Sequence, residues 1–179
     1  MEHLSDLMKL SSLYLFGKLE PASIITSRLP ESLTELILSA SQLPNDTMKN
    51  LGELPKLKSL SFFSGSFQGS DMVFSGQSFP QLLVLKLWSL DNLESVNVEE
   101  GAMKNLRGME IRSCKHLTVT NGLTHLETLQ ELKLTNMPEN YETGVRTQFA
   151  EAIEKSRIKI IHCPRIKIVR FSPGDNINP

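Results

Sequence analysis

The sequence contains few cysteines, no long apolar run and almost no net charge, and each shortage excludes a class of protein. Two cysteines in 179 residues are too few for a disulfide scaffold and lack the close spacing of structural zinc ligands. No segment approaches the roughly 20 apolar residues of a membrane-spanning helix. A net charge of −1 gives no overall attraction to nucleic acid or to an anionic membrane. We therefore expect no metal, no membrane span and no nucleic-acid partner, and a reducing compartment such as the cytoplasm.

Signatures of enzyme chemistry are also absent. No phosphate-binding loop of the form GxxxxGK[ST] surrounds any of the ten glycines, and neither GxSxG nor HExxH occurs. The four histidines are dispersed along the chain. We therefore expect no enzyme, no cofactor and no small-molecule substrate.

Apolar residues recur in the pattern LxxLxL, where x is any residue. Its positions are apolar in six windows, at residues 10–15, 33–38, 57–62, 82–87, 106–111 and 129–134. Successive windows begin 23 to 25 residues apart, within the range of about 20 to 29 residues that is typical of leucine-rich repeats. The spacing therefore predicts tandem leucine-rich repeats over about residues 4–137.

A single repeat of this kind cannot bury its own leucines, so neighbouring repeats must stack them into a shared core. Stacking predicts a solenoid of the α/β repeat class, with a concave parallel sheet and a mostly irregular convex side. Its strands should centre near residues 13, 36, 60, 85, 109 and 132. We expect one domain over residues 1–179, in which the Ser/Gly-rich segment 63–77 is an irregular return loop.

The repeat pattern ends after Pro138. Helical spacing of apolar residues predicts an amphipathic helix near 143–155, with Asn140 or Thr143 as its cap and an apolar face of Val145, Phe149, Ala152 and Ile153. Strand-like alternation follows at 157–163 and 165–171. We expect these elements to cap the solenoid over about 138–172, ahead of a flexible tail at 173–179.

Four stretches carry a more specific pattern than the repeat itself. They are FPQLLVLKL at 79–87, VEEGAM at 98–103, IRSCKHL at 111–117 and LTNMP at 134–138. With them the chain resembles, over about residues 30–138, the C-terminal leucine-rich repeats of plant intracellular nucleotide-binding disease-resistance receptors of the coiled-coil class.

The resemblance implies a non-catalytic, cytoplasmic module of plant innate immunity that recognises a ligand or holds the receptor inactive. Its implied partners are a pathogen effector or a guarded host protein, and the nucleotide-binding domain of a receptor. The chain departs from that family because it has neither a phosphate-binding loop nor a signalling coiled coil, and its register already starts at Leu4. We therefore expect a fragment or truncated product of such a receptor.

Side chains alternate between the two faces of a strand, so residues flanking the second and third leucines of each window should face the concave surface. Neighbouring parallel strands lie about 4.8 Å apart, which should make Phe63, Trp88 and Arg112 neighbours. Exposed aromatic and arginine side chains are common hot spots of protein binding. The predicted protein-binding residues are Tyr14, Phe16, Glu35, Ile37, Phe63, Val84, Lys86, Trp88, Glu110, Arg112 and Lys133.

Other interpretations of the same residues stay open. Phe63 and Trp88 would also fit packing under neighbouring loops or against another domain. The charges of Lys86, Glu110 and Lys133 would also fit a self-neutralising ladder on a solvated sheet. Between residues 155 and 170 the chain has six Lys or Arg and no acid, which suits binding to phosphates, binding to an acidic protein surface, or the solvent-facing side of a cap strand.

Alternative functions remain as well. An adaptor that presents substrates to a ubiquitin ligase would use the same repeats, although no F-box-like segment precedes them. An extracellular receptor domain is disfavoured, because the sequence has no signal peptide, cysteine-paired cap or LxGxIP motif. A non-functional gene fragment is the third alternative.

Overall fold

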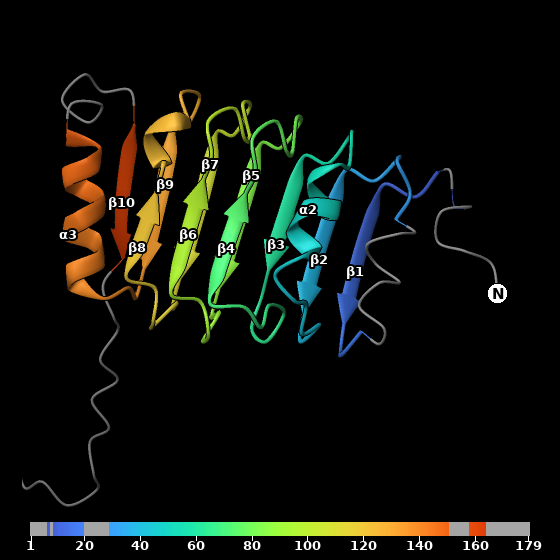
Figure 1. Ribbon diagram of the computed structural model, residues 1–179, viewed down its shortest axis with the longest axis horizontal. Coiled ribbons are helices and arrows are strands. Elements are labelled where there is room, and N and C mark those ends of the chain that lie inside the picture. Colours follow the sequence, from blue (N-terminus) through green and yellow to red (C-terminus); the bar gives the residue numbers. More distant parts are fainter. Residues whose placement is uncertain (1–6, 8, 20–28, 151–157, 164–179) are drawn as a thin grey trace, which may run out of the picture.

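The computed structural model describes residues 7, 9–19, 29–150 and 158–163, which form one row of stacked repeats (Figure 1). A seven-stranded sheet runs along the row, with every neighbouring pair of strands parallel. Its strands are β1 (Ser12–Phe16), β2 (Glu35–Ser39), β3 (Ser59–Phe62), β5 (Val84–Trp88), β7 (Gly108–Arg112), β9 (Glu131–Thr135) and β10 (Lys159–Cys163). The predicted solenoid and its six strand positions are confirmed.

The leucines of successive repeats lie side by side because the strands pair without a register shift. Leu36 pairs with Leu60, Leu60 with Leu85, and Leu85 with Met109. These four side chains are almost completely buried. Each strand alternates such inward residues with more exposed ones, which is the period that a strand imposes on its side chains.

The convex side is more regular than the sequence predicted. It carries a second, three-stranded parallel sheet of β4 (Asp71–Phe74), β6 (Ser95–Val98) and β8 (Val119–Asn121), together with the helix α2 (Thr47–Gly52) and the 3-10 turn η2 (Leu123–His125). The expectation that 63–77 is wholly irregular is therefore wrong, since it contains β4. These strands are only three or four residues long, too short for their alternation to stand out in the sequence.

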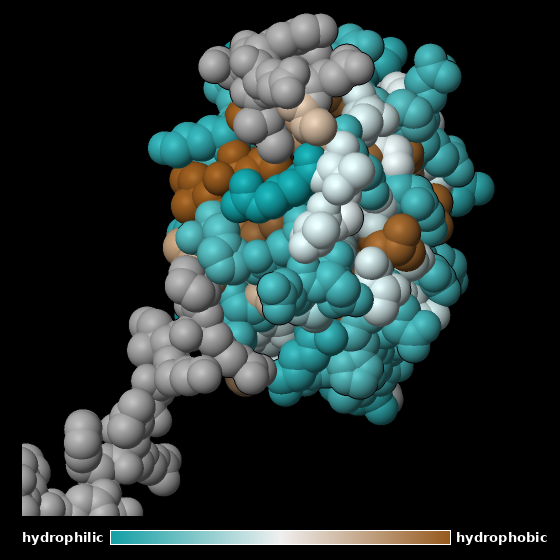
Figure 2. Space-filling model, turned by 90° about the vertical axis from the view of Figure 1, so that its left-hand side faces the viewer, coloured by the Kyte–Doolittle hydropathy of each residue, from teal (hydrophilic) through white to brown (hydrophobic). Residues whose placement is uncertain are grey.

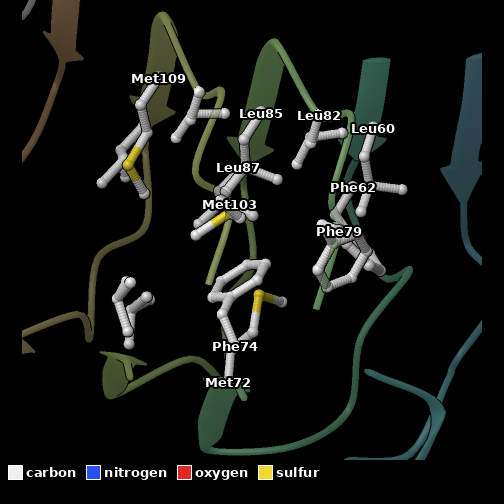
Figure 3. Packing of buried hydrophobic residues seen from close by; sticks show 14 of the residues in the cluster. Leu60, Phe62, Met72, Phe74, Phe79, Leu82, Leu85, Leu87, Met103 and Met109 are labelled. Atoms are coloured by element: carbon white, nitrogen blue, oxygen red, sulfur yellow. The ribbon is translucent and has the colours of Figure 1, made fainter. Parts of the chain in front are cut away.

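The core lies between the two sheets. In Figure 3, Phe62 and Leu87 of the large sheet point into the same interior as Met72 and Phe74 of β4. Phe74 and Phe79 pack with ring centroids 5.5 Å apart. The buried residues form one continuous cluster that spans the repeats, as expected where no repeat has a core of its own.

Five strands of the large sheet are followed directly by a residue with positive φ. These residues are Gly17, Ala40, Ser89, Ser113 and Asn136, whereas the positive φ after β3 comes three residues later, at Gly65. The chain then turns inward, and Cys114 follows Ser113 into the core, where its thiol donates to the carbonyl of Leu87 at 3.5 Å. Burial raises the pKa of the Cys114 thiol to about 11, so this cysteine stays protonated and acts as a packing residue.

The helix of the C-terminal cap begins earlier than predicted. The helix α3 (Glu139–Gln148) has Pro138 as its N-cap, and not Asn140 or Thr143; Thr143 lies inside the helix and donates to the carbonyl of Glu139. Glu139 and Glu142 in the first turn complement the positive end of the helix dipole, which supports the earlier start. Residues 151–157 and the predicted strand at 165–171 lie outside the described residues, whereas the strand expected at 157–163 is β10.

Buried residues of α3 fasten it to the repeats. Val145 and Phe149 are buried as predicted, and Tyr141 is buried beside them. The Tyr141 hydroxyl lies 2.7 Å from Thr120 Oγ1 of β8, so the two buried hydroxyl groups form a hydrogen bond with each other. Figure 2 views this end of the molecule and shows a mostly polar surface interrupted by apolar areas, the largest of them at the upper left.

Replacing Leu85 should destabilise the fold strongly. Leu85 is fully buried between Leu60 and Met109, so Leu85→Ala leaves a cavity and should lower the free energy of unfolding by about 2 to 5 kcal/mol. Urea unfolding followed by circular dichroism measures the change. Val73→Ala, at a position 37% exposed on the convex sheet, is the control and should change stability by less than about 0.5 kcal/mol. Equal losses in both variants would contradict the core assignment.

Removing one hydroxyl of the Tyr141–Thr120 pair should lower the free energy of unfolding more than removing both hydroxyls. Tyr141→Phe leaves the Thr120 hydroxyl buried without a partner, so we expect a loss of about 1 to 3 kcal/mol in unfolding free energy. Adding Thr120→Val should recover part of that loss, because no polar group is then stranded. A double variant that is simply additive would mean that the hydrogen bond does not couple α3 to β8.

Candidate protein-binding site

The side chains predicted to face the concave surface do so. On β5, Val84, Lys86 and Trp88 are half-buried and alternate with the fully buried Leu85 and Leu87. The same alternation places Glu110 and Arg112 of β7, and Lys133 of β9, on that surface. The concave face is therefore built by strand periodicity alone.

Four of these side chains gather around one indole ring and are named here the Trp88 cluster: Phe63, Lys86, Trp88 and Arg112. Phe63 stacks on Trp88, with ring centroids 4.7 Å apart and an angle of 23° between the planes. Lys86 Nζ lies 5.6 Å and Arg112 Cζ 5.4 Å from the centroid of the Trp88 ring. Both cations lie within the range of a cation–π attraction, which further fixes the ring.

Parallel register brings the cluster together from three repeats. Phe63 immediately follows β3 and donates its backbone N–H to Leu38 at 2.8 Å, which continues the sheet by one residue. Trp88 pairs with Arg112 across β5 and β7, and Lys86 lies two residues before Trp88 on the same strand face. The predicted contact of Phe63, Trp88 and Arg112 is confirmed.

The cluster is only partly covered by the rest of the chain. Phe63 and Trp88 are half-buried, and Arg112 is exposed. Trp88 Nε1 is itself shielded from solvent and has no acceptor within the described ranges. The rings thus bury part of each other, but no described loop packs over them completely.

The charged ladder on the neighbouring strands is incomplete. Lys133 Nζ lies 3.5 Å from Glu110 Oε1, so these two charges neutralise each other. Lys86 is opposite Glu110 in register, yet its ammonium lies over Trp88. Neither Lys86 nor Arg112 is within ion-pair distance of a carboxylate in the described part of the chain. Two positive charges therefore remain unneutralised at the Trp88 cluster.

The predicted site residues near the N-terminal end form a separate group. Tyr14 donates its hydroxyl to Glu35 at 3.0 Å, and that hydrogen bond and the carboxylate charge raise the pKa of Tyr14. Phe16 is 86% exposed, and Ile37 lies between Tyr14 and the serines of β3. The structure does not bring this group to the Trp88 cluster, since the short side chains of β3 separate the two.

A cavity that sequence reasoning missed lies at the C-terminal cap. Its volume is about 610 Å³, and it is lined by Lys115, Asn136, Met137, Pro138, Glu139, Glu142 and His162. His162 occupies the column that leucine, isoleucine or phenylalanine fills in the other strands and pairs with Leu134 in register. Its Nδ1 lies 2.6 Å from Glu142 Oε2 of α3. Although it lies in this column, His162 is exposed, because β10 is the last strand of the described sheet.

The basic segment 155–170 is described only from 158 to 163. Within this part, Lys159 is exposed on the edge strand β10 and Ile160 packs against the core, as the alternation predicted. Arg157, Arg165 and Lys167 lie outside the described residues. No helix in the described ranges has the length and apolar character needed to cross a membrane.

Comparison with known proteins places this geometry in a family. A family model described as "Leucine-rich repeat region" matches residues 1–165. The chain therefore belongs to the leucine-rich repeat family, a class of non-catalytic repeat module, in agreement with the parallel solenoid.

Disease resistance proteins of Arabidopsis thaliana are among the relatives of the chain. The chain is 33% identical over 159 residues to disease resistance protein RPM1, with 88% of the chain and 16% of that protein aligned. It is 36% identical over 116 residues to disease resistance protein RPP8, covering 64% of the chain and 13% of that protein. It is 45% identical over 89 residues to probable disease resistance protein RF9, covering 50% of the chain and 8% of that protein. The chain is thus homologous to the leucine-rich repeats of plant disease resistance proteins and spans at most about a sixth of their length.

Loss of the Phe63 ring should expose Trp88. Trp88 is the sole tryptophan of the chain, so its fluorescence reports on the Trp88 cluster alone. Phe63→Ala removes the ring stacked at 4.7 Å, and we expect a red-shifted emission and stronger quenching by acrylamide. Phe16→Ala, at an 86% exposed position outside the cluster, is the matched control and should leave the spectrum unchanged. Unchanged emission in Phe63→Ala would mean that the two rings do not stack in solution.

Proposed function

We propose that this chain is the recognition and autoinhibitory part of a plant intracellular immune receptor and acts in the cytoplasm in the defence response. It binds proteins through its concave sheet and catalyses no reaction. The observation that carries the proposal is the Trp88 cluster, which presents two stacked aromatic rings and an exposed arginine on a rigid sheet. The names of the relatives, which are disease resistance proteins, supply the biological setting.

The chemistry of the Trp88 cluster suits protein binding. Tryptophan and arginine are enriched among residues whose truncation costs about 2 kcal/mol or more of binding energy. Phe63 and Trp88 lie on neighbouring strands, so a partner meets a surface whose side chains are already ordered, which lowers the entropic cost of association. The surrounding strands are locked by buried leucines and need not move.

Two kinds of partner fit this role. One is a pathogen effector or a guarded host protein, and the other is the nucleotide-binding switch domain of a receptor. A repeat module that binds the resting switch more tightly than the active one stabilises the resting state by that difference in affinity. Such a module acts as a brake, and a ligand that competes for the same concave surface releases it.

The proposal is tested by supplying the chain separately from the switch. The chain is co-expressed in leaves with a constitutively active, repeat-deleted receptor of the same plant, and cell death and co-purification are measured. We expect the chain to co-purify with the switch domain and to reduce cell death. Trp88→Ala should weaken co-purification by about 30-fold, which corresponds to roughly 2 kcal/mol.

Variants separate loss of binding from loss of folding. Leu85→Ala lies in the core and should fail through instability, whereas Trp88→Ala should keep the circular dichroism spectrum and most of the unfolding free energy. Lys56→Ala changes an exposed residue outside the concave columns and should behave as the unmodified chain. Unchanged cell death together with no association would rule out the brake role. A Trp88→Ala variant as unstable as Leu85→Ala would make the Trp88 cluster part of the core.

A further inference from the structure

The Trp88 cluster contains donors and positive charges without matching acceptors. The ammonium of Lys86 and the guanidinium of Arg112 lie 5.6 Å and 5.4 Å from the same ring centroid. Neither has a carboxylate partner in the described ranges, and the indole N–H of Trp88 has no acceptor there. Lysine, arginine and tryptophan side chains donate hydrogen bonds and accept none. Any polar group that complements this cluster must therefore be an acceptor, and a negative one is favoured.

From this arrangement, and resting on the proposed function of the concave sheet, we propose that the Trp88 cluster binds an acidic segment of a protein partner. At least one carboxylate of that segment lies between Lys86 and Arg112, and an apolar side chain packs against the stacked Phe63 and Trp88 rings. Anion binding relieves the repulsion between two cations that share one ring. Lys86 is half-buried, which strengthens its contact with the carboxylate relative to that of a fully solvated charge.

The neighbouring charges confine this preference to one place on the sheet. Lys133 lies on the strand next to that of Glu110 and forms an ion pair with its carboxylate at 3.5 Å, so its charge is already neutralised. The chain as a whole carries a net charge of −1, so an acidic partner gains nothing from the molecule at large. The attraction arises only at Lys86 and Arg112, and this fixes the register of the bound segment.

An apolar position adjoins Lys86 on the side away from Trp88. Val84 precedes Lys86 by two residues on β5, and Gly108 lies opposite Val84 on β7. A Cβ atom placed on Gly108 would meet no other atom within 4 Å, so the surface is open there. The order along the sheet is therefore apolar, positive, apolar, and the complementary segment has an acidic residue with apolar residues on both sides.

Single-stranded nucleic acid is the main competing anion, and the surface fits it less well. Base stacking needs a free aromatic face, but one face of Trp88 is already covered by Phe63. Carboxylates of Glu35, Glu110 and Glu131 stand on the same sheet, where a phosphate backbone would meet them. Two unpaired cations are too few to follow a chain of phosphates.

Fluorescence of the sole tryptophan tests the local charge directly. Iodide should quench Trp88 more strongly than caesium at low ionic strength, because the two cations concentrate anions at the ring. Lys86→Gln and Arg112→Gln should each reduce the iodide-to-caesium ratio, whereas Lys56→Gln, at an exposed position outside the cluster, should not. Equal quenching by the two ions in the unmodified chain would overturn the proposal.

Titration with defined peptides tests the ligand class. The probes are a dodecapeptide with four acidic and four apolar residues in alternating pairs, its copy with Asn and Gln in place of the acids, its copy with Lys, and a dT12 oligonucleotide. We expect the acidic peptide to bind about tenfold more tightly than the amide copy in 50 mM salt, with the difference shrinking as salt rises. Arg112→Gln should weaken binding about fivefold or more while the circular dichroism spectrum is unchanged.

The outcomes separate this inference from the proposed function. If the amide copy or dT12 binds as tightly as the acidic peptide, the acidic preference is wrong. If Trp88→Ala abolishes association with the switch domain but Arg112→Gln does not change it, the concave sheet binds proteins and only the acidic inference fails. If the acidic peptide binds through Arg112 but no association with the switch domain depends on Trp88, the inference stands and the brake role fails.

Discussion

The structure depends on the inability of one repeat to bury its own leucines. Each strand contributes two inward side chains, and these become solvent-free only when the strands on both sides pair in the same register. Leu36, Leu60, Leu85 and Met109 form one such column, in which each member covers its neighbours. The stability of each repeat therefore depends on the repeats beside it. A substitution of one buried leucine destabilises the two adjacent repeats first.

The same register that builds the core also builds the proposed binding surface. When inward residues align across strands, the residues between them align on the concave side, so Phe63, Trp88 and Arg112 meet although they lie about 25 residues apart in sequence. Because the backbone under the Trp88 cluster is held by buried leucines, the cluster is presented without a flexible loop. The cluster thus combines a rigid base with half-exposed aromatic and cationic groups, which is the combination that protein recognition uses.

The two ends of the described solenoid differ in the elements that form them. At the C-terminal end, α3 covers the last repeats through Tyr141, Val145 and Phe149, and polar groups replace leucine where His162 meets Glu142. At the N-terminal end, β1 forms the edge of the sheet, and its Tyr14 and Phe16 are largely exposed.

The sequence by itself determined the solenoid, the six strands of the repeats and the side chains on the concave face, because the spacing of leucines and the alternation of a strand leave few alternatives. It also determined that Phe63, Trp88 and Arg112 would be neighbours. Only the tertiary structure decided that Lys86 turns toward Trp88 and leaves Glu110 to Lys133, since side-chain choice among several nearby partners depends on three-dimensional packing. The convex sheet, the start of α3 at Glu139 and the contact of His162 with Glu142 were likewise decided by pairing between distant segments, which the local pattern of three or four residues does not specify.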